Sequence, residues 1–330
     1  MTKDENIAEH DFGHVTVLLH EAAESLNLPS GAVAVDCTLG GGGHTRLLLD
    51  AVGKNGKVLA FDRDLMAIEH AQKAFAGEIF SGQLLLVHKP FSEMPDHVHK
   101  AGLTGSVAGI LADLGVSSPQ IDLGERGFSF LKDGPLDMRM DTTRPGTAAE
   151  LVNTAEETEL ALIFRDFGEE PMGRHFAKMI CRQRLIAPFM TTGELASYVE
   201  KHSPYGSKSR KHPATKIFQA LRIAVNGELT ELDQFLARAV PLLAPNGRLA
   251  IISFHSLEDR AVKRFFAEVS GKLKRQELSR MVAITERELD KMVNAQGRVV
   301  LPTPVEPSLQ EVEANPRARS AKLRVFEKGC

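Results

Sequence analysis

A short apolar run that ends at an acid and meets four consecutive glycines constrains the fold of this chain more than any other stretch. Residues 33–35 are Val-Ala-Val, Asp36 follows, residues 40–43 are all glycine, and a helical pattern begins near residue 46. This order predicts a strand, a tight turn and a helix. Glycines let a ligand approach the backbone and a helix start offers unpaired N–H groups, so the turn suits a nucleotide. Such turns also form for steric reasons alone, and both interpretations stay open here.

A second acid narrows the choice of ligand. Residues 57–61 form another apolar run, which ends at Asp62. An acid about 20 residues beyond the glycines, at the tip of the second strand, is placed to accept hydrogen bonds from ribose hydroxyls. This geometry fits both NAD and S-adenosylmethionine. The dinucleotide spacing fails because its third glycine position is Thr45, and no GxxxxGK[ST] is present. Since Asp36 opens the turn, we expect a positively charged ligand and favour S-adenosylmethionine as the cofactor.

Composition limits the class of protein and its surroundings. The chain has 330 residues, 43% hydrophobic and 25% charged, which allows one large domain or two. Its cysteines, Cys37, Cys181 and Cys330, form no CxxC, so we expect neither disulfides nor a metal site, and a reducing cytoplasmic location. No signal peptide or apolar stretch of about 20 residues is found, so no membrane partner is expected. The net charge of −3 requires any nucleic-acid surface to be a local patch.

Further strands extend the α/β pattern. Residues 84–87 and 107–112 read as strands, and the second of these ends at Asp113. Ligands of open parallel sheets bind beyond the carboxyl ends of the strands, so we expect Asp36, Asp62 and Asp113 to converge on one crevice. A single strand-end aspartate is as often a cap or turn former. Phe91 follows the third strand and covers either an adenine ring or the core; the sequence does not choose between them.

The alternation of strand and helix stops after Asp113. Residues 115–141 are rich in Gly, Pro and charge, and a loop of this length is usually functional or disordered. Helical patterns follow at 148–152, 156–167 and 172–186, and an earlier one covers 14–28. The sheet resumes with a fifth strand at 248–254 after an Asn246-Gly247 turn. We therefore expect a helical insertion within one α/β domain.

Basic residues gather within this insertion. Arg174, Lys178 and Arg182 are spaced four apart on one helix face, which either holds phosphates or is simply solvated. Residues 201–226 contain six cations and no acid, a pattern that indicates a polyanionic partner. Tyr198 and Tyr205 offer stacking faces beside them. The six cations are Lys201, Lys208, Arg210, Lys211, Lys216 and Arg222.

The C-terminal part carries fewer signals. Ser256 and Asp259 have the spacing of a capping box, while Phe254 and His255 stand at a strand end from which they can reach a substrate. Residues 271–300 are polar and uninformative. Residues 317–326 alternate and predict a late strand, whose arginines are either solvated or near RNA.

Taken together, seven blocks of this sequence closely resemble the bacterial RsmH (MraW) methyltransferases. The likeness runs from about residue 14 to 327, and the blocks occur in the same order. They are residues 36–44 (DCTLGGGGH), 113–120 (DLGVSSPQ), 126–130 (RGFSF), 134–141 (GPLDMRMD), 212–215 (HPAT), 253–260 (SFHSLEDR) and 315–320 (NPRARS).

The resemblance implies a class I (Rossmann-like) S-adenosylmethionine-dependent methyltransferase sheet with an inserted α-helical domain. It also implies methylation of the N4 amino group of a decoding-centre cytosine in 16S rRNA, within the small ribosomal subunit. We expect residues 1–120 and 226–330 to form the methyltransferase domain and 121–225 to recognise RNA. The expected cofactor-binding residues are Asp36, Gly42, Gly43, His44, Asp62, Phe91, Asp113 and Gln120. The expected RNA-binding residues are Arg174, Lys178, Arg182, Lys208, Arg210, Lys211 and Lys216, and no metal ligand is expected.

The catalytic assignment follows from the chemistry of the amine. The N4 lone pair of cytosine is delocalised into the ring, so acceptors must draw on its protons; Asp113 and the carbonyls of 114–116 are the candidates. The chain lacks the Asp/Asn-Pro-Pro-aromatic motif of many amino-methylating enzymes. An unstacked cytosine could be received by Phe128, Phe130 or Phe254. Two other classes remain: an NAD-dependent oxidoreductase and a non-catalytic ribosome-assembly factor.

Overall fold

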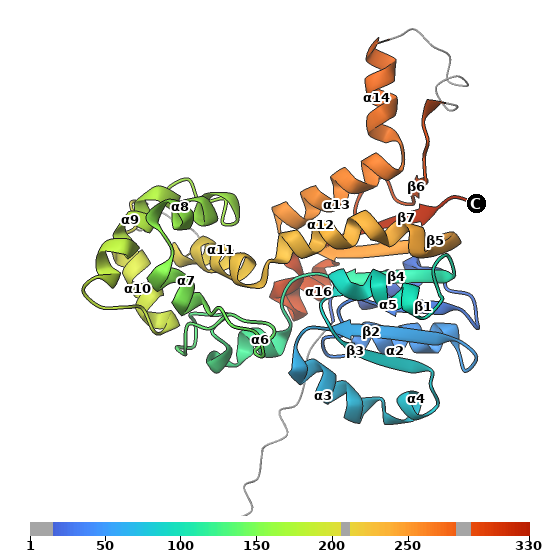
Figure 1. Ribbon diagram of the computed structural model, residues 1–330, viewed down its shortest axis with the longest axis horizontal. Coiled ribbons are helices and arrows are strands. Elements are labelled where there is room, and N and C mark those ends of the chain that lie inside the picture. Colours follow the sequence, from blue (N-terminus) through green and yellow to red (C-terminus); the bar gives the residue numbers. More distant parts are fainter. Residues whose placement is uncertain (1–15, 206–211, 282–291) are drawn as a thin grey trace, which may run out of the picture.

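The computed structural model describes residues 16–205, 212–281 and 292–330, which build a seven-stranded sheet with helices on both faces (Figure 1). The strands lie in the order β3-β2-β1-β4-β5-β7-β6. Strands β1 to β5 are parallel, whereas β7 runs antiparallel to β5 and β6 antiparallel to β7. Their bounds are β1 Val33–Asp36, β2 Lys57–Asp62, β3 Leu84–His88, β4 Val107–Asp113, β5 Leu243–Ser253, β6 Gly297–Val299 and β7 Lys322–Lys328.

Both faces of the central strands are buried, which explains their continuous apolar runs. Val35 and Leu59 point into the core shared with α5, α12 and α13, whereas Ala34 and Val58 point into the core shared with α1, α2 and α3. The helices around the sheet are α1 Leu19–Ser25, α2 Gly43–Val52, α3 Leu65–Ala74, α4 Ala76–Phe80, α5 Met94–Lys100, α12 Glu228–Ala239, α13 Ser256–Val269, α14 Lys272–Met281 and α16 Leu309–Ala314. Short 3-10 helices are η1 Phe91–Glu93, η4 Val240–Leu242 and η5 Pro316–Ser320.

A second group of helices lies between β4 and β5 in the chain and stands beside the sheet (Figure 1). It has its own apolar core, which includes Leu136, Phe164, Phe176 and Leu221. We call residues 118–226 the helical part; the predicted boundaries at 121 and 225 stay a prediction. Its elements are α6 Ser118–Asp122, η2 Gly124–Arg126, α7 Ala148–Thr154, α8 Glu157–Asp166, α9 Gly173–Arg184, α10 Thr192–Lys201 and α11 Ala214–Asn226.

Ion pairs and a hydrogen bond connect the helical part to the carboxyl edge of the sheet. Arg126 donates to the carboxylate of Asp64 at 2.8 Å, and Arg63 donates to the carbonyl of Asn226 at 2.9 Å. On the other side, Arg260 of α13 donates to Glu169 at 2.9 Å. The space between the two parts is therefore bounded by fixed side chains.

The register of the strands decides which of the strand-end acids reach this space. Asp36 is aligned with Ala60 of β2 and with Leu111 of β4. Asp62 and Asp113 therefore extend two residues, about 6.5 Å, further along the edge than Asp36. The sequence alone does not reveal this offset, because each acid simply follows an apolar run.

Several expectations from the sequence need correction. The first helix is shorter than residues 14–28, because Leu18 adopts a left-handed conformation with φ 51° before α1 begins. The Asn246-Gly247 turn is a bulge within β5, since β5 gains residues between its pairings of Leu243 with Val107 and Arg248 with Gly109. The late strand begins only at residue 322, because Asn315 caps η5. The stretch 271–300 contains α14 and part of the sheet, β6.

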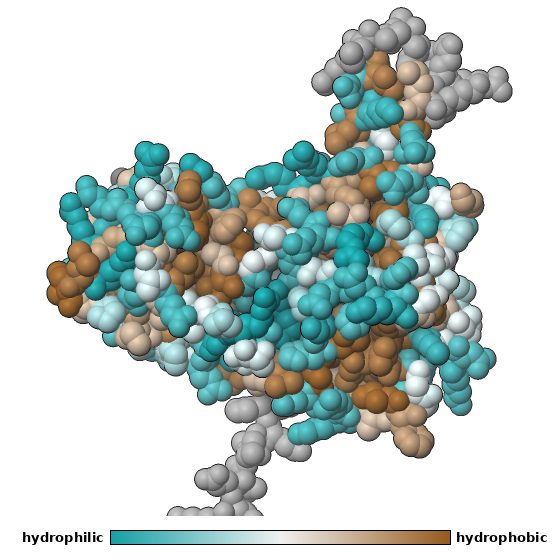
Figure 2. Space-filling view, in the orientation of Figure 1, coloured by the Kyte–Doolittle hydropathy of each residue, from teal (hydrophilic) through white to brown (hydrophobic). Residues whose placement is uncertain are grey.

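The surface is mixed in character. On the face drawn in Figure 2, hydrophilic side chains cover much of the molecule, with apolar groups between them. Among the described residues, no helix has both the length and the apolar character needed to cross a bilayer.

Candidate functional site

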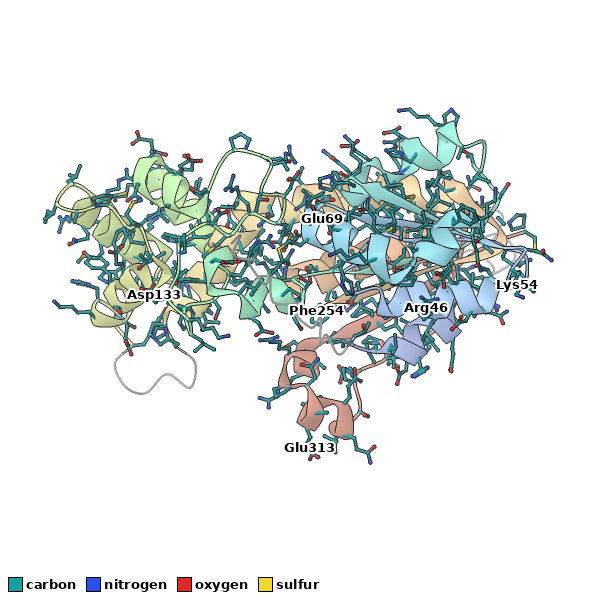
Figure 3. The ribbon with its side chains drawn as sticks, turned by 90° about the horizontal axis from the view of Figure 1, so that it is seen from below. Arg46, Lys54, Glu69, Asp133, Phe254 and Glu313 are labelled. Atoms are coloured by element: carbon teal, nitrogen blue, oxygen red, sulfur yellow. The ribbon has the colours of Figure 1, made fainter. Side chains whose placement is uncertain are left out.

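A cavity of about 330 Å³ lies at the carboxyl edge of the sheet, within the size range of small-ligand sites. Its walls come from the glycine turn, the ends of β2 and β4, the loop after β4, and the elbow between α11 and α12. Phe254, labelled in Figure 3, lies where the sheet and the helical part meet. Topology places this cavity where parallel α/β sheets bind ligands.

The glycine turn forms one wall, and close packing explains its composition. A Cβ on Gly43 would lie 2.2 Å from the hydroxyl of Thr16, and one on Gly42 would lie 2.6 Å from the ring of Phe75. Gly42 also has φ 82°, in the region that favours glycine. Gly40, Gly41 and Gly43 line the cavity. Gly42 is not among the lining residues and packs against Phe75, and its contact with the cofactor stays a prediction.

Asp36 is likewise displaced from its predicted role at the ligand. Its side chain is fully buried, accepts from the Thr45 hydroxyl at 2.6 Å and from the Thr38 N–H at 3.0 Å, and is not among the cavity residues. Burial raises the pKa of Asp36 to about 6, although these two bonds oppose the rise. These two bonds stabilise the glycine turn. The Asp36 carboxylate does not line the cavity because β1 ends two residues earlier than β2 and β4.

Asp62 lies where a ribose acceptor is expected. Its two oxygens accept from the N–H groups of Gly40 and Asp64, each at 2.8 Å, and the residue lines the cavity. Burial raises the pKa of Asp62 to about 6, against the lowering effect of those bonds. Each carboxylate oxygen keeps a second lone pair, so two hydroxyls can still be bound.

Phe91 and Gln120 also line the cavity, but their surroundings differ. Phe91 is half-buried and packs edge-on against Phe235 with 5.3 Å between ring centroids. Phe91 therefore packs in the core and also lines the cavity, and its contact with an adenine ring stays a prediction. The Gln120 amide donates to Asp64 at 2.8 Å and accepts from the Ser117 N–H at 3.0 Å. Its side chain is thus fixed by the protein at the cavity edge.

Asp113 and His44 form the polar floor of the cavity. The Oδ2 atom of Asp113 lies 3.8 Å from Nδ1 of the buried His44, and the Asp113 N–H donates to Thr38 at 2.7 Å. Within the described residues, the other oxygen, Oδ1, is buried without a hydrogen-bond partner. Burial raises the pKa of Asp113 well above its usual value, and Asp36 and Glu258 add to the rise. An unsatisfied buried carboxylate oxygen calls for an explanation, and a ligand supplies one.

The start of α13 corrects another prediction. The capping box is formed by His255 and Glu258, one residue before the predicted pair Ser256 and Asp259. Glu258 accepts from the Phe254 N–H at 2.8 Å and lies 3.2 Å from Nε2 of His255. Asp259 instead pairs with Arg324 of β7 at 2.7 Å. The side chain of Arg324 is therefore already paired with α13.

The structure separates the predicted RNA-binding cations. Arg174, Lys178 and Arg182 are all exposed on α9, as their spacing predicts. Lys216 is exposed but donates to the carbonyl of Glu169 at 2.8 Å. Lys208, Arg210 and Lys211 lie outside the described residues.

Arg222 and the two tyrosines of the predicted basic and stacking set have structural partners. Arg222 lines the cavity and donates to both oxygens of Glu228, each at 2.8 Å, so it does not belong to an outer RNA surface. The Tyr198 hydroxyl donates to the carbonyl of Met179 at 3.0 Å, and the Tyr205 hydroxyl donates to Glu170. Of the three candidate phenylalanines, Phe254 lines the cavity, whereas Phe130 packs on Phe218 in the helical part.

The sequence analysis assigned Arg222 to a polyanion-binding set and missed Glu228 and Glu231, the acids of the α11–α12 elbow. Arg222 and Glu228 pair across the elbow, and Glu231 of α12 binds Arg63 and also lines the cavity. Only tertiary structure brings these groups to the sheet edge, because neither the spacing nor the composition of residues 222–231 distinguishes them from a solvated helix. The Asn226-Gly227 pair was the one local sign of a bend, and Gly227 has φ 61°.

The strand order, the glycine turn and the strand-end carboxylate together define an α/β protein of the class I methyltransferase type. The chain belongs to the MraW methylase family, which matches residues 11–329. It is 45% identical over 318 residues to "Ribosomal RNA small subunit methyltransferase H" of Shewanella frigidimarina, covering 96% of this chain and 98% of that protein. The protein of the same name from Alteromonas mediterranea is 44% identical over 322 residues, covering 97% and 98%. The resemblance drawn from the sequence blocks is confirmed.

Solved structures give a more distant likeness. A SAM-dependent methyltransferase from Aquifex aeolicus matches with a TM-score of 0.36 and 11% identity, over 94% of this chain and 90% of that chain. A SAM-dependent O-methyltransferase from Thermotoga maritima matches with a TM-score of 0.39 and 11% identity, over 94% and 64%.

Proposed function

We propose that this protein transfers a methyl group from S-adenosylmethionine to the N4 amino group of a decoding-centre cytosine in 16S rRNA of the small ribosomal subunit. The names of the relatives support an rRNA substrate in the small subunit. The observation that carries the choice of an amine is Asp113, which lines the cavity and has one buried carboxylate oxygen without a hydrogen-bond partner among the described residues. Such a substrate places the reaction in the cytoplasm, where ribosomes are assembled.

The residues of the cavity fit an adenosine that bears a positive charge. Asp62 is available to the ribose hydroxyls, and Phe91 offers an apolar face to the adenine. Gly40, Gly41, Gly43 and His44 complete the wall on which the methionine end would rest. Several carboxylates near the cavity favour a cation over an anion.

The same contacts disfavour NAD. A pyrophosphate needs free N–H groups at the glycine turn. Here the Gly40 N–H donates to Asp62 at 2.8 Å and the Gly42 N–H donates to the carbonyl of Leu39 at 2.7 Å. Two donors of the turn are therefore already satisfied by the protein. Calorimetry with NAD and with S-adenosylmethionine distinguishes the oxidoreductase from the methyltransferase.

The sulfonium of the bound cofactor supplies an electrophilic methyl group and a ready leaving group. The protein then has to position the amine and polarise it. The Asp113 carboxylate accepts a hydrogen bond from the N4 amino group, which increases the availability of its lone pair. A bound cation near Asp113 lowers the pKa of that carboxyl again and so favours the ionised, accepting form. Since methyl transfer first gives an N4-methylated cation, which is a strong acid, its proton can pass to Asp113 or to water after transfer, and a strong general base is unnecessary.

The target base has to leave its RNA stack to reach this floor. Phe254 is the aromatic residue that the structure brings to the cavity, and its ring lies against Gly115, where a Cβ would be 3.3 Å from Cδ2. The exposed cations of α9 are available for phosphates of the surrounding RNA, which would hold the substrate during transfer.

The test is methyl transfer to small-subunit particles from cells that lack this gene. Purified protein and labelled S-adenosylmethionine are incubated with the particles, and the rRNA nucleosides are analysed by mass spectrometry. We expect one labelled cytosine, methylated at N4. Label at another atom or base would contradict the proposed target. Binding to the particles without transfer would support the non-catalytic assembly factor instead.

A further inference from the structure

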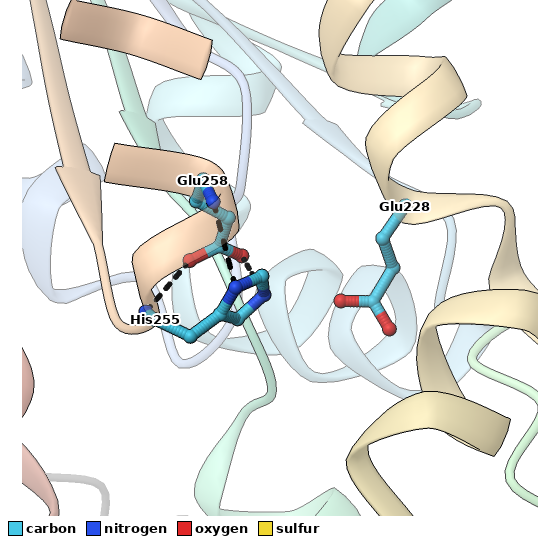
Figure 4. A group of neighbouring side chains, drawn as sticks. All are labelled: Glu228, His255 and Glu258. Carbon is cyan, nitrogen blue, oxygen red and sulfur yellow. Dashed lines mark hydrogen bonds and ion pairs between the residues drawn. The ribbon is translucent and has the colours of Figure 1, made fainter. Parts of the chain in front are cut away.

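A charged cluster on the cavity wall has no part in the methyl transfer as proposed above. Arg222 comes from the end of α11, Glu228 from the start of α12, and His255 and Glu258 from the start of α13. Figure 4 shows the Glu228 carboxylate directed toward the space beside the His255 ring. The side chains of Arg222 and Glu228 are 16% and 10% exposed, those of His255 and Glu258 10% and 4%. Charges this deeply desolvated are costly unless they are paired.

Arg222 already provides the positive charge that this cluster requires. Ligand atoms of Glu228, His255 and Glu258 lie within 4.8 Å of one another, a spacing that would admit a metal ion. However, Arg222 donates through Nε and Nη2 to the two oxygens of Glu228. A metal ion would have to displace this bidentate pair, so the guanidinium takes the place of a cation. Burial raises the pKa of Glu258, but His255, Arg222 and the Phe254 N–H together outweigh burial and keep this pKa below its usual value.

The elbow between α11 and α12 fixes the direction of this guanidinium. The Asn226 amide donates to the carbonyls of Met138 and Arg222 at 2.8 and 2.9 Å, and its oxygen accepts from the Met140 N–H at 2.8 Å. Gly227 then turns the chain in a left-handed conformation so that Glu228 faces back toward Arg222. Both bonds to Glu228 use Nε and Nη2, which leaves the Nη1 amino group for a ligand. A planar donor group held in this way is suited to reading the edge of a base.

Cytosine needs such a donor next to its amine. Its N3 and O2 atoms are hydrogen-bond acceptors, and they stand beside N4 on the same edge. Asp113, Phe254 and Arg222 all line this one cavity, so a base with N4 at Asp113 and its ring on Phe254 can direct this edge toward Arg222. Glu258 connects the two ends of the site, because it raises the pKa of Asp113 and is itself stabilised by Arg222.

We propose that Arg222, oriented by Glu228, donates hydrogen bonds to N3 and O2 of the target cytosine and thereby determines the base specificity of the site. This inference rests on the proposed function. Uracil presents an N3–H donor to the guanidinium and an O4 acceptor to Asp113, so both contacts become repulsive. The positive charge of Arg222 and the carboxylate of Asp113 thus read opposite ends of one base edge.

The experiment measures binding of cytidine, 3-deazacytidine and uridine to the protein saturated with S-adenosylhomocysteine. The wild type should bind cytidine at least about tenfold more tightly than the other two, since each lacks an acceptor at N3. Arg222→Gln should reduce this ratio to near one. The double variant Arg222→Gln/Glu228→Gln guards against the effect of an unpaired Glu228, and Arg238→Gln, which breaks an exposed pair with Asp96, is the matched control.

Two further readouts separate the possible failures. Calorimetric affinity for S-adenosylmethionine should stay unchanged in the Arg222 variants, which shows that the cavity has kept its shape. Wild-type protein without a preference for cytidine, or Arg222 variants that keep the preference, overturns the assignment of Arg222. Absence of methyl transfer to small-subunit particles by the wild type defeats the proposed function itself, whatever the nucleoside ratios are.

Discussion

The carboxyl edge of the sheet and the outer face of α9 carry charges in opposite surroundings. At the sheet edge, burial raises the pKa of Asp62 and of Asp113, so these carboxylates are sensitive to a bound cation. On α9, Arg174, Lys178 and Arg182 are exposed, where water and salt screen them. A desolvated group acts strongly on one atom nearby, whereas solvated groups act weakly and additively on a polyanion. We propose that the first kind of site governs the chemistry and the second governs the affinity for RNA.

Substitutions can test this contrast between the sheet edge and α9. If it holds, changes at the sheet edge alter turnover or cofactor binding and leave the salt dependence of RNA binding intact. Changes on α9 should do the reverse. A variant that shifts both properties equally would show that the two regions are coupled.

The largest effect is expected at Asp113. Asp113→Ala removes the acceptor for the N4 hydrogen, so kcat should fall by about 10²- to 10⁴-fold, the usual range for a positioned acid–base group. Binding of small-subunit particles should change little. Steady-state methyl transfer together with filter binding measures both properties. Unchanged turnover would remove Asp113 from the mechanism.

The pH profile offers an independent check on Asp113. Only the ionised carboxylate accepts from the amine, and burial raises the pKa of this group. Activity should therefore decline, as pH falls, at a higher pH than an ordinary aspartate would cause. In Asp113→Asn, the residual activity should lack this limb of the profile of kcat/KM for S-adenosylmethionine, which reports the free enzyme. A wild-type profile that stays flat down to about pH 4 would contradict this assignment.

Asp62 should show the second largest effect. Asp62→Ala removes both ribose acceptors and also releases the N–H groups of Gly40 and Asp64. Two hydrogen bonds to a charged acceptor correspond to about 3 kcal/mol or more, so affinity for S-adenosylmethionine should fall at least about 100-fold. Calorimetry measures this loss, and Asp62→Asn, which keeps one acceptor oxygen, should fall between the two. Equal affinities in all three proteins would place the ribose elsewhere.

The helical part should respond through ionic strength. The triple variant Arg174→Gln/Lys178→Gln/Arg182→Gln should bind small-subunit particles more weakly. Its slope of log affinity against log salt should decrease by about 0.7–0.9 for each phosphate contact that is lost. Turnover at saturating substrate should stay near the wild-type value. Lys54→Gln/Lys57→Gln, at the opposite end of the sheet, is the matched control, and an equal slope in both variants would identify α9 as merely solvated.

Local sequence patterns predicted the parts of the fold in which neighbouring residues decide the structure. The strand, glycine turn and helix at residues 33–52 follow from an apolar run, four glycines and a helical stripe, and the structure contains β1 and α2 there. The same reasoning failed where partners are distant in the chain. The Asn246-Gly247 pair looks like a turn, but pairing with β4 turns it into a bulge.

Some residues of the candidate site could likewise be predicted from local sequence patterns, and others could not. Asp62 and Asp113 reach the cavity because the residue after an inner parallel strand stands at the carboxyl edge. Asp36 follows the same local pattern but is withdrawn by the register of β1. Arg222 was predicted only as part of a basic stretch and Glu228 was not predicted at all, since their pairing depends on an elbow that only the packed chain forms. The sequence pattern identifies candidate residues, and strand register and packing determine which of them reach the cavity.

The smallest effect we predict tests this separation of Asp36 from the cavity. The native pKa of Asp36 is about 6, above its usual 3.8. Between these values the native protein holds a proton that the unfolded chain has lost, so stability falls as pH rises from about 4 to about 6. A rise of roughly two units corresponds to about 2–3 kcal/mol above that window. Asp36→Asn lacks this charge and can keep both bonds to the turn.

Thermal denaturation of Asp36→Asn at pH 8 and pH 4 measures the difference. We expect a melting temperature a few degrees above wild type at pH 8, convergence at pH 4, and unchanged affinity for S-adenosylmethionine. Asp36→Ala is the control: it loses the bonds to Thr38 and Thr45, and should be less stable at both pH values. Loss of cofactor affinity in the stable Asn variant would show that Asp36 contributes to cofactor binding. Retained affinity would support the assignment of cofactor binding to Asp62 and Asp113, the two acids that extend beyond β1.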